Sequence, residues 1–187
     1  MNTYKLILKR RTIRKFAQAK IRESVLVACI NAGRVAPSAA NSQPLEYILI
    51  TKNLNSIFEC IHWASYLKNG DPEINERPTA YILILSNTEI NKEAKYDVGL
   101  AAENIVLTAL ERGIASCIIG YLERDKLIKN LAIPDKYVVE LVLALGYPQQ
   151  KSVKDKFSGD VRYWIDKEGI LHVPKRKLED IIHKEIF

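Results

Sequence analysis

Cysteine is scarce in this sequence, and the few copies present argue against two common uses of the residue. The 187 residues contain only Cys29, Cys60 and Cys117. The count is odd, each cysteine sits in an apolar run, and none belongs to a CxxC or Cys/His spacing. This usage suggests neither a disulfide framework nor a zinc site. It predicts a protein of the reducing cytoplasm.

Long hydrophobic runs are also missing. The N-terminus has an apolar core of only Leu6, Ile7 and Leu8 before the charges resume at Lys9. That run is too short for a signal peptide, and no other run approaches the ~18 residues that a membrane helix needs. We therefore expect a soluble, unexported protein.

The sequence offers no recognisable set of side chains for nucleophilic or metal catalysis. Its three histidines, His62, His172 and His183, are far apart and follow no ligand pattern. No Ser/His/Asp or Cys/His combination, glycine-rich phosphate loop or metal spacing can be assembled. We expect surface or structural roles for the histidines and a core position for Cys117.

The overall composition is that of one globular domain. Hydrophobic residues make up 48% of the chain and charged residues 27%. We expect a single domain over residues 1–187, in which 151–187 forms a lysine-rich C-terminal extension. The net charge of +6 and the pI of about 9.1 favour anionic partners but do not choose among them.

Helical and strand patterns alternate along the chain. Apolar spacing and flanking turn residues predict helices over Arg22–Val35, Ser56–Tyr66, Asp97–Glu111 and Glu123–Leu131, and strands over Glu46–Thr51, Ala80–Ser86, Ile114–Gly120 and Tyr137–Tyr147. The polar segment Lys68–Pro78 reads as a loop. This order predicts an α+β or α/β sandwich in which helices flank a central mixed sheet.

Two segments need a surface to cover them. The helix predicted over Asp97–Glu111 is apolar almost all round, so it should lie inside the protein or in a subunit interface. The tail ends in PKRKLEDIIHKEIF, for which we predict a short helix with an apolar stripe of Leu178, Ile181 and Ile182. A solvated extension is the alternative for the tail.

Two polar segments are candidates for binding. The stretch KRRTIRKF, Lys9 to Phe16, sets cations on both sides of Thr12 and suits nucleic acid, an anionic membrane or a phosphorylated ligand. The loop APSAANSQP, Ala36 to Pro44, offers uncharged donors and acceptors between two prolines. Taken alone, that loop is better explained as a connection whose side chains hydrogen-bond to their own backbone.

Together these segments resemble the two signature segments of the nitroreductase family of FMN-dependent oxidoreductases. Further on, DVGLAAENIVLTALERGIASCIIG resembles the family's long central helix and the strand that runs under the flavin. LALGYP and PKRKLEDII resemble its next strand end and its basic tail motif. The chain departs from the family at Leu45, where an aromatic residue is common, and in a long segment over 151–172, which places the substrate preference in doubt.

The resemblance implies a set of flavin contacts. Arg10, Arg11 and Thr12, with Lys175 or Arg176 from the tail, would hold the phosphate. Arg14 would lie near the pyrimidine edge of the ring and stabilise the charge of the reduced flavin. The remaining contacts with the ring and the ribityl chain would come from Pro37, Ser38, Asn41 and Gln43, and from the backbone near Ile118, Ile119 and Gly120.

The resemblance also implies an activity and an assembly. NADH or NADPH would pass a hydride to FMN, and a small acceptor such as a nitroaromatic, quinone or enone would then be reduced in a ping-pong scheme. The protein would be a homodimer with FMN in the interface and the tail packed on the partner subunit. Two alternatives stay open: a flavin sensor or storage protein without turnover, and a basic module that binds nucleic acid.

Overall fold

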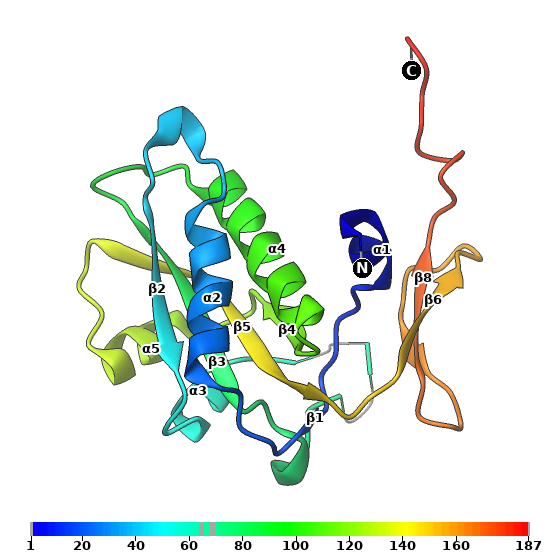
Figure 1. Ribbon diagram of the computed structural model, residues 1–187, viewed down its shortest axis with the longest axis horizontal. Helices are drawn as coiled ribbons and strands as arrows, with labels where there is room; N and C mark the ends of the chain where they lie inside the picture. The colour runs from blue at the N-terminus through cyan, green and yellow to red at the C-terminus, as the bar shows by residue number, and fades with distance from the viewer. Residues whose placement is uncertain (1, 64–65, 68–69, 187) are drawn as a thin grey trace.

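The central feature of the fold is a five-stranded sheet between two layers of helices (Figure 1). The computed structural model describes residues 2–63, 66–67 and 70–186. The strand order is β2, β3, β5, β1, with β4 also paired to β5. The bounds are β1 Phe16–Ala17, β2 Leu45–Ile50, β3 Ala80–Asn87, β4 Ala115–Ile119 and β5 Tyr137–Pro148. The predicted α+β class with a central sheet is therefore confirmed.

Every strand pair of this sheet is antiparallel, which differs from the mixed sheet that we expected. Strands β3 and β4 do run in the same direction, because α4 carries the chain back between them. They are not neighbours, however, since β5 lies between them and pairs antiparallel with both. The parallel contact in this region of the described chain is the single bridge between Thr12 and Ser116.

The helices cover both faces of the sheet (Figure 1). Their bounds are α1 Thr3–Lys9, α2 Glu23–Arg34, α3 Asn55–Phe58, α4 Lys95–Glu111 and α5 Arg124–Leu131. The 3₁₀ turns Ala39–Asn41 and Ile74–Glu76 lie in the connections. The predictions for α2, α4 and α5 are confirmed to within two residues at each end. None of the described helices is long and apolar enough to cross a membrane.

Two helical segments differ from the prediction. Helix α1 was not predicted, although Asn2 caps it by accepting a hydrogen bond from the Lys5 amide at 2.9 Å. The helix predicted over Ser56–Tyr66 ends at Phe58, and residues 64 and 65 of that range lie outside the described residues. After a turn at residues 59 and 60, Ile61 pairs with Leu122, so tertiary pairing overrides the local helical pattern.

The C-terminal extension forms a small sheet of its own. Strands β6 Ser152–Lys156, β8 Leu171–Lys175 and β7 Trp164–Ile165 pair in that order. His172 of β8 stacks on Trp164 at 4.1 Å and makes hydrogen bonds with Asp166 at 3.1 Å and Asp155 at 3.2 Å. These bonds, that with Asp166 foremost, raise the pKa of His172, because they favour its charged form.

The helix predicted for the last residues is absent from the described part of the tail. Residues 176–186 form turns, and Leu178, Ile181 and Ile182 are exposed. An isolated helix this short is marginal in water unless it buries an apolar face, and the described chain gives the tail no such surface.

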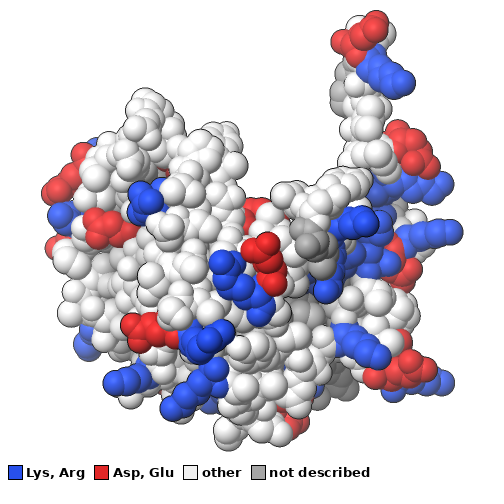
Figure 2. All heavy atoms as spheres, viewed as in Figure 1, with Lys and Arg blue, Asp and Glu red and all other residues white. Residues whose placement is uncertain are grey.

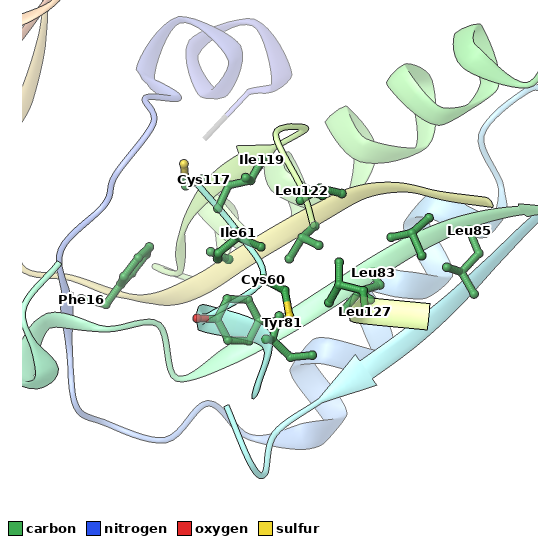
Figure 3. Packing of buried hydrophobic residues seen from close by; sticks show 14 of the residues in the cluster. Phe16, Cys60, Ile61, Tyr81, Leu83, Leu85, Cys117, Ile119, Leu122 and Leu127 are labelled. Carbon is green, nitrogen blue, oxygen red and sulfur yellow. The ribbon is translucent and has the colours of Figure 1, made fainter. Parts of the chain in front are cut away.

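The core divides into two clusters, one on each face of the sheet. Alternate residues of β3 point in opposite directions, so Tyr81 and Leu83 face α3 and α5, and Ile82 and Ile84 face α2 and α4. Figure 3 shows the first cluster, to which Cys60 and Cys117 belong. All three thiols are free and buried, and burial raises the pKa of Cys117 to about 11.

The crossing of α2 and α4 depends on Gly33. An added Cβ at this position would lie 2.8 Å from Cδ1 and from Cγ1 of Ile105. We expect Gly33→Ala to lower the free energy of unfolding by about 1–3 kcal/mol, because the two helices must move apart. Denaturant unfolding measures this change.

A double-mutant cycle supplies the control. Ile105→Ala alone should cost about 2–5 kcal/mol because it leaves a cavity. The double variant should lose less than the sum of the single changes, by at least about 1 kcal/mol, because the truncated side chain makes room for the new methyl group. Strictly additive losses would contradict the proposed clash.

Candidate functional site

The basic segment at the N-terminus runs along the edge of the sheet. The Ile13 amide donates to the Ser116 carbonyl of β4 at 3.0 Å, and the Gln149 amide donates to the Lys15 carbonyl at 3.0 Å. The Arg14 amide donates to Oε1 of Gln150 at 3.3 Å. The segment is thus fixed between β4 and the end of β5, and its side chains are placed by its backbone.

The extended backbone of this segment points successive side chains in opposite directions. Ile13 is buried in the core, so the neighbouring Thr12 and Arg14 point to the other side of the extended chain. The Arg14 guanidinium lies 4.7 Å from the ring centroid of Tyr163, in the C-terminal extension. The Arg10 guanidinium lies 3.6 Å from the Glu103 carboxylate of α4.

Four cations line a cavity of about 300 Å³ at this edge of the sheet. Lys9, Arg10 and Arg11 meet Lys151 there, and the walls include Ile13, Leu110 and Val153. No described acidic residue lines the cavity. Burial, with the nearby charge of Arg10, lowers the pKa of Arg11. Arg10 already pairs with Glu103 of α4, so Lys9, Arg11 and Lys151 are the cations of this cavity that favour an anionic ligand.

The two tail cations lie around a different hollow. Lys175 and Arg176 line a cavity of about 470 Å³ together with Tyr163, and Arg176 donates to the Asp180 carbonyl at 2.7 Å. Tyr163 therefore lies between these cations and Arg14. Within one chain, the structure brings Arg14 close to the tail, whereas Arg10 and Arg11 share their cavity with Lys151 instead. Figure 2 shows lysine and arginine side chains gathered on the side of this face that carries the extension.

The end of β4 presents an open stretch of backbone. Ile119 is buried in the core, whereas Ile118 is 38% exposed and Gly120 is exposed. A Cβ at Gly120 would make only an ordinary contact, 3.4 Å from Leu141. The packing of the described chain thus does not require glycine here. A flat group lying against the backbone would explain it.

The loop 36–44 lies at the other end of α4. Asp97, in the first turn of that helix, accepts a hydrogen bond from the Ala39 amide at 3.1 Å. Ser38 Oγ accepts one from the Gln43 amide at 3.0 Å, and the Gln43 side chain donates to the Asn41 carbonyl at 3.3 Å. Some side chains of the loop therefore hydrogen-bond to the loop's own backbone, as expected if the loop only connects a helix to a strand.

Other features of the loop suggest a binding role in addition to connecting a helix to a strand. Ala40, Asn41 and Gln43 have positive φ angles, a strained region for residues other than glycine. Ser42 Oγ and Asp97 Oδ2 are buried and have no hydrogen-bond partner among the described residues. Pro37, Ser38, Gln43 and Asp97 line a cavity of about 130 Å³, whose wall includes Leu45.

Asp97 was not predicted as a site residue. In the structure it is a buried carboxylate, with only 3% of the residue exposed. The sequence feature that could have identified Asp97 is a carboxylate at the start of an otherwise apolar helix. The basic segment and the loop meet different parts of that helix, since Glu103 and Leu110 lie by the former and Asp97 by the latter. One chain therefore carries two separate groups of candidate residues.

Comparison with known proteins identifies the fold and the lineage. A family model described as the Nitroreductase family matches residues 7–68 and 57–147. The chain belongs to this family. The match includes the basic segment, the loop and the strands of the main sheet, so the resemblance seen in the sequence is confirmed.

Several relatives of this nitroreductase family member align with most of its chain. A protein of Archaeoglobus fulgidus named as an NADH dehydrogenase/NAD(P)H nitroreductase is 30% identical over 169 residues, which cover 85% of this chain and 91% of the relative. A nitroreductase family structure from Clostridium novyi NT is 26% identical, covers 80% of this chain and 88% of its own, and has a TM-score of 0.67. The structure of an FMN-dependent nitroreductase from Clostridium difficile R20291 is 22% identical, covers 97% of this chain and 98% of its own, and has a TM-score of 0.72.

The hydrogen bond between Asp97 and the loop can be tested alone. Asp97→Ala should raise the exchange rate of the Ala39 amide at least about tenfold, because a hydrogen bond to a charged group contributes about 1.5–3 kcal/mol to its protection. Asp97→Asn keeps an acceptor oxygen and should leave that rate within about threefold of the wild type. Hydrogen exchange followed by NMR distinguishes the variants, and unchanged exchange in Asp97→Ala would show that the loop holds its shape without this bond.

Proposed function

We propose that this nitroreductase family member is an FMN-dependent oxidoreductase that uses NADH or NADPH to reduce a small organic acceptor such as a nitroaromatic, quinone or enone. The observation that carries the proposal is the cavity lined by Lys9, Arg10, Arg11 and Lys151 beside an open strand end. The name of the Clostridium difficile relative includes FMN, and that of the Archaeoglobus relative includes NAD(P)H.

The residues at this edge suit the parts of FMN. Arg10, Arg11 and Thr12 would bind the phosphate, because guanidinium groups and a hydroxyl donate to phosphate oxygens. Arg14 would hold a positive charge near the ring. The backbone of residues 118–120 would lie against the ring, which explains the glycine. FMN bound by these residues would supply the two-electron chemistry that links the nicotinamide to the acceptor.

The proposal includes a homodimer with one flavin at each of two shared sites. Loop 36–44 and the basic segment lie at different parts of α4, so a second copy would bring the loop of one chain to the cations of the other. Exposed apolar residues on α1, on α4 and in the tail support this, namely Tyr4, Ile7, Leu8, Tyr96, Leu100, Leu178, Ile181 and Ile182. Figure 2 shows the molecule hollowed between the tip of the tail and the helices.

The visible absorption spectrum of the purified protein tests the proposal directly. We expect a flavin spectrum that bleaches when NADH or NADPH is added without oxygen and returns when an acceptor follows. A bound flavin that does not bleach would favour a sensor or storage protein. A colourless protein that takes up no added FMN would refute the flavin assignment.

The charge of Arg14 has a separable effect on the reduced flavin. Arg14→Ala should slow reduction by the nicotinamide at least about tenfold, or ~1.4 kcal/mol, because the cation stabilises the charge that forms on the ring. The dissociation constant of FMN should change less than about threefold, since the phosphate contacts remain. Stopped-flow absorbance measures the first quantity and flavin fluorescence the second. Arg14→Lys keeps the charge and is the control, and equal losses of binding and reduction would contradict this role.

The contribution of the tail to phosphate binding can be compared with that of Lys151. If the tail closes the site, Lys175→Gln with Arg176→Gln should weaken FMN binding at least about tenfold, because two charge-assisted hydrogen bonds are lost. Lys177→Gln is the matched control, because Lys177 pairs with Glu179 on the surface at 3.7 Å. Unchanged binding in the double variant and a loss in Lys151→Gln would show that Lys151, and not the tail, completes the phosphate site of Arg10 and Arg11.

A further inference from the structure

A short ladder beyond β4 holds three polar or aromatic side chains in one place. The His62 amide donates to the Tyr121 carbonyl at 3.0 Å, and the Glu123 amide donates to the Cys60 carbonyl at 2.8 Å. Between these bonds, Ile61 pairs antiparallel with Leu122. Ile61 and Leu122 are buried in the core, as Figure 3 shows. Alternation therefore turns His62, Tyr121 and Glu123 outward.

The outward side chains form a defined group. The rings of His62 and Tyr121 have centroids 4.2 Å apart and an interplanar angle of 34°. Nε2 of His62 lies 2.9 Å from Oε1 of Glu123. The imidazole is thus held on one side by a ring and on another by a carboxylate, while Nδ1 makes no hydrogen bond to a described residue. Tyr121 is 72% exposed, so this group contributes little to the core.

The group lies next to the open end of β4. Tyr121 directly follows Gly120, where the proposed flavin ring lies, and neighbouring Cα atoms are about 3.8 Å apart. The other charged groups nearby have partners of their own. Lys126 lies 3.8 Å from the Glu59 carboxylate, and the Arg124 guanidinium donates to the carbonyls of Val139 and Gly120. Within the described chain, His62 is the side chain of this group with a nitrogen available for proton transfer.

We propose that His62 donates a proton to a quinone-type acceptor and that Glu123 is its positioning residue. The proposal rests on the proposed function. A quinone becomes a hydroquinone by taking up two electrons and two protons, and hydride transfer accounts for both electrons and one proton. The second proton passes from Nδ1 of the His62 imidazolium to a quinone oxygen, and the neutral imidazole regains a proton from water. Glu123 holds the imidazole in place through Nε2, and the exposed Tyr121 ring offers the quinone a face on which to stack.

The choice of acceptor separates proton donation from a structural role. Reduced protein with bound flavin is mixed in a stopped-flow instrument with a quinone, or with ferricyanide, which takes electrons without protons. We expect His62→Gln to slow reoxidation by the quinone about 100-fold, the low end for a positioned proton donor. Reoxidation by ferricyanide should stay within about twofold of the wild type, because no proton is transferred.

Three further variants sharpen the test. His62→Phe keeps a ring against Tyr121 but carries no proton, so it should show the same selective loss. Glu123→Gln should show a smaller selective loss, because the imidazole remains but is less well held. Glu59→Gln alters a neighbouring carboxylate that pairs with Lys126 and should change neither rate. Equal losses with both acceptors, or an unchanged quinone rate in His62→Gln, would overturn the proposal.

A binding measurement supplies a readout that does not depend on turnover. Adding the quinone to the oxidised protein should shift the ring resonances of His62 in an NMR spectrum, which are assigned by their loss in His62→Gln. No shift at a saturating quinone concentration would overturn the contact. A wild type that binds no flavin would refute the proposed function instead, and a wild type that reduces ferricyanide but no quinone would leave that function standing while refuting this inference.

Discussion

The pairing of β5 with three other strands is the constraint on which the rest of this structure depends. β5 is hydrogen-bonded to β3, β4 and β1, so it sets the register of most of the sheet. A slip of β5 by one residue would turn each of its side chains to the opposite face and disrupt the packing of both core clusters. The same pairing places the candidate site, because the chain beyond β5 binds the backbone at Arg14 and Lys15 while β4 holds residues 116–120 beside them.

Helix α4 links the two groups of candidate residues. One of its faces is buried against the sheet and α2 through Val98, Ala102 and Ile105, whereas Leu100 is exposed. Asp97 at its start fixes the strained loop, and Glu103 in its middle lies beside Arg10. Helix α4 therefore packs against the core and also separates loop 36–44 from the basic segment. That separation supports the proposed site shared between two chains.

Much of the fold followed from local patterns, and the failures have physical causes. Helices α2, α4 and α5 and the long strands are set by apolar periodicity, so the sequence predicts them well. The helix predicted over Ser56–Tyr66 failed because residues 60–62 gain more from pairing with residues 121–123 than from one more helical turn. The tail helix failed because its apolar stripe has no surface to bury in the described chain.

The sequence suggested which residues to consider for the candidate site, but it could not show which of them lie together in the fold. Signature segments identify Arg10, Arg14 and the loop 36–44, yet no local pattern reports that Lys151 joins Arg11 in one cavity. The role of Asp97 in holding the loop, and the pairing of His62 with Glu123, depend on contacts between residues more than 50 positions apart. Only the folded chain brings such pairs together.

Several costs of the described fold fall on the basic segment, on loop 36–44 and on the exposed helix faces. Burial of Arg11 lowers its pKa, residues 40, 41 and 43 keep strained backbone angles, and apolar side chains of α1 and α4 face solvent. Each kind of cost is offset by a different partner: an anion for the cations, a polar ligand for the loop and an apolar surface for the helices. A flavin shared between two copies of the chain would supply all three. The acceptor would then meet Tyr163 and the group of His62, residues outside the signature segments, so substrate preference is free to change while flavin binding is retained.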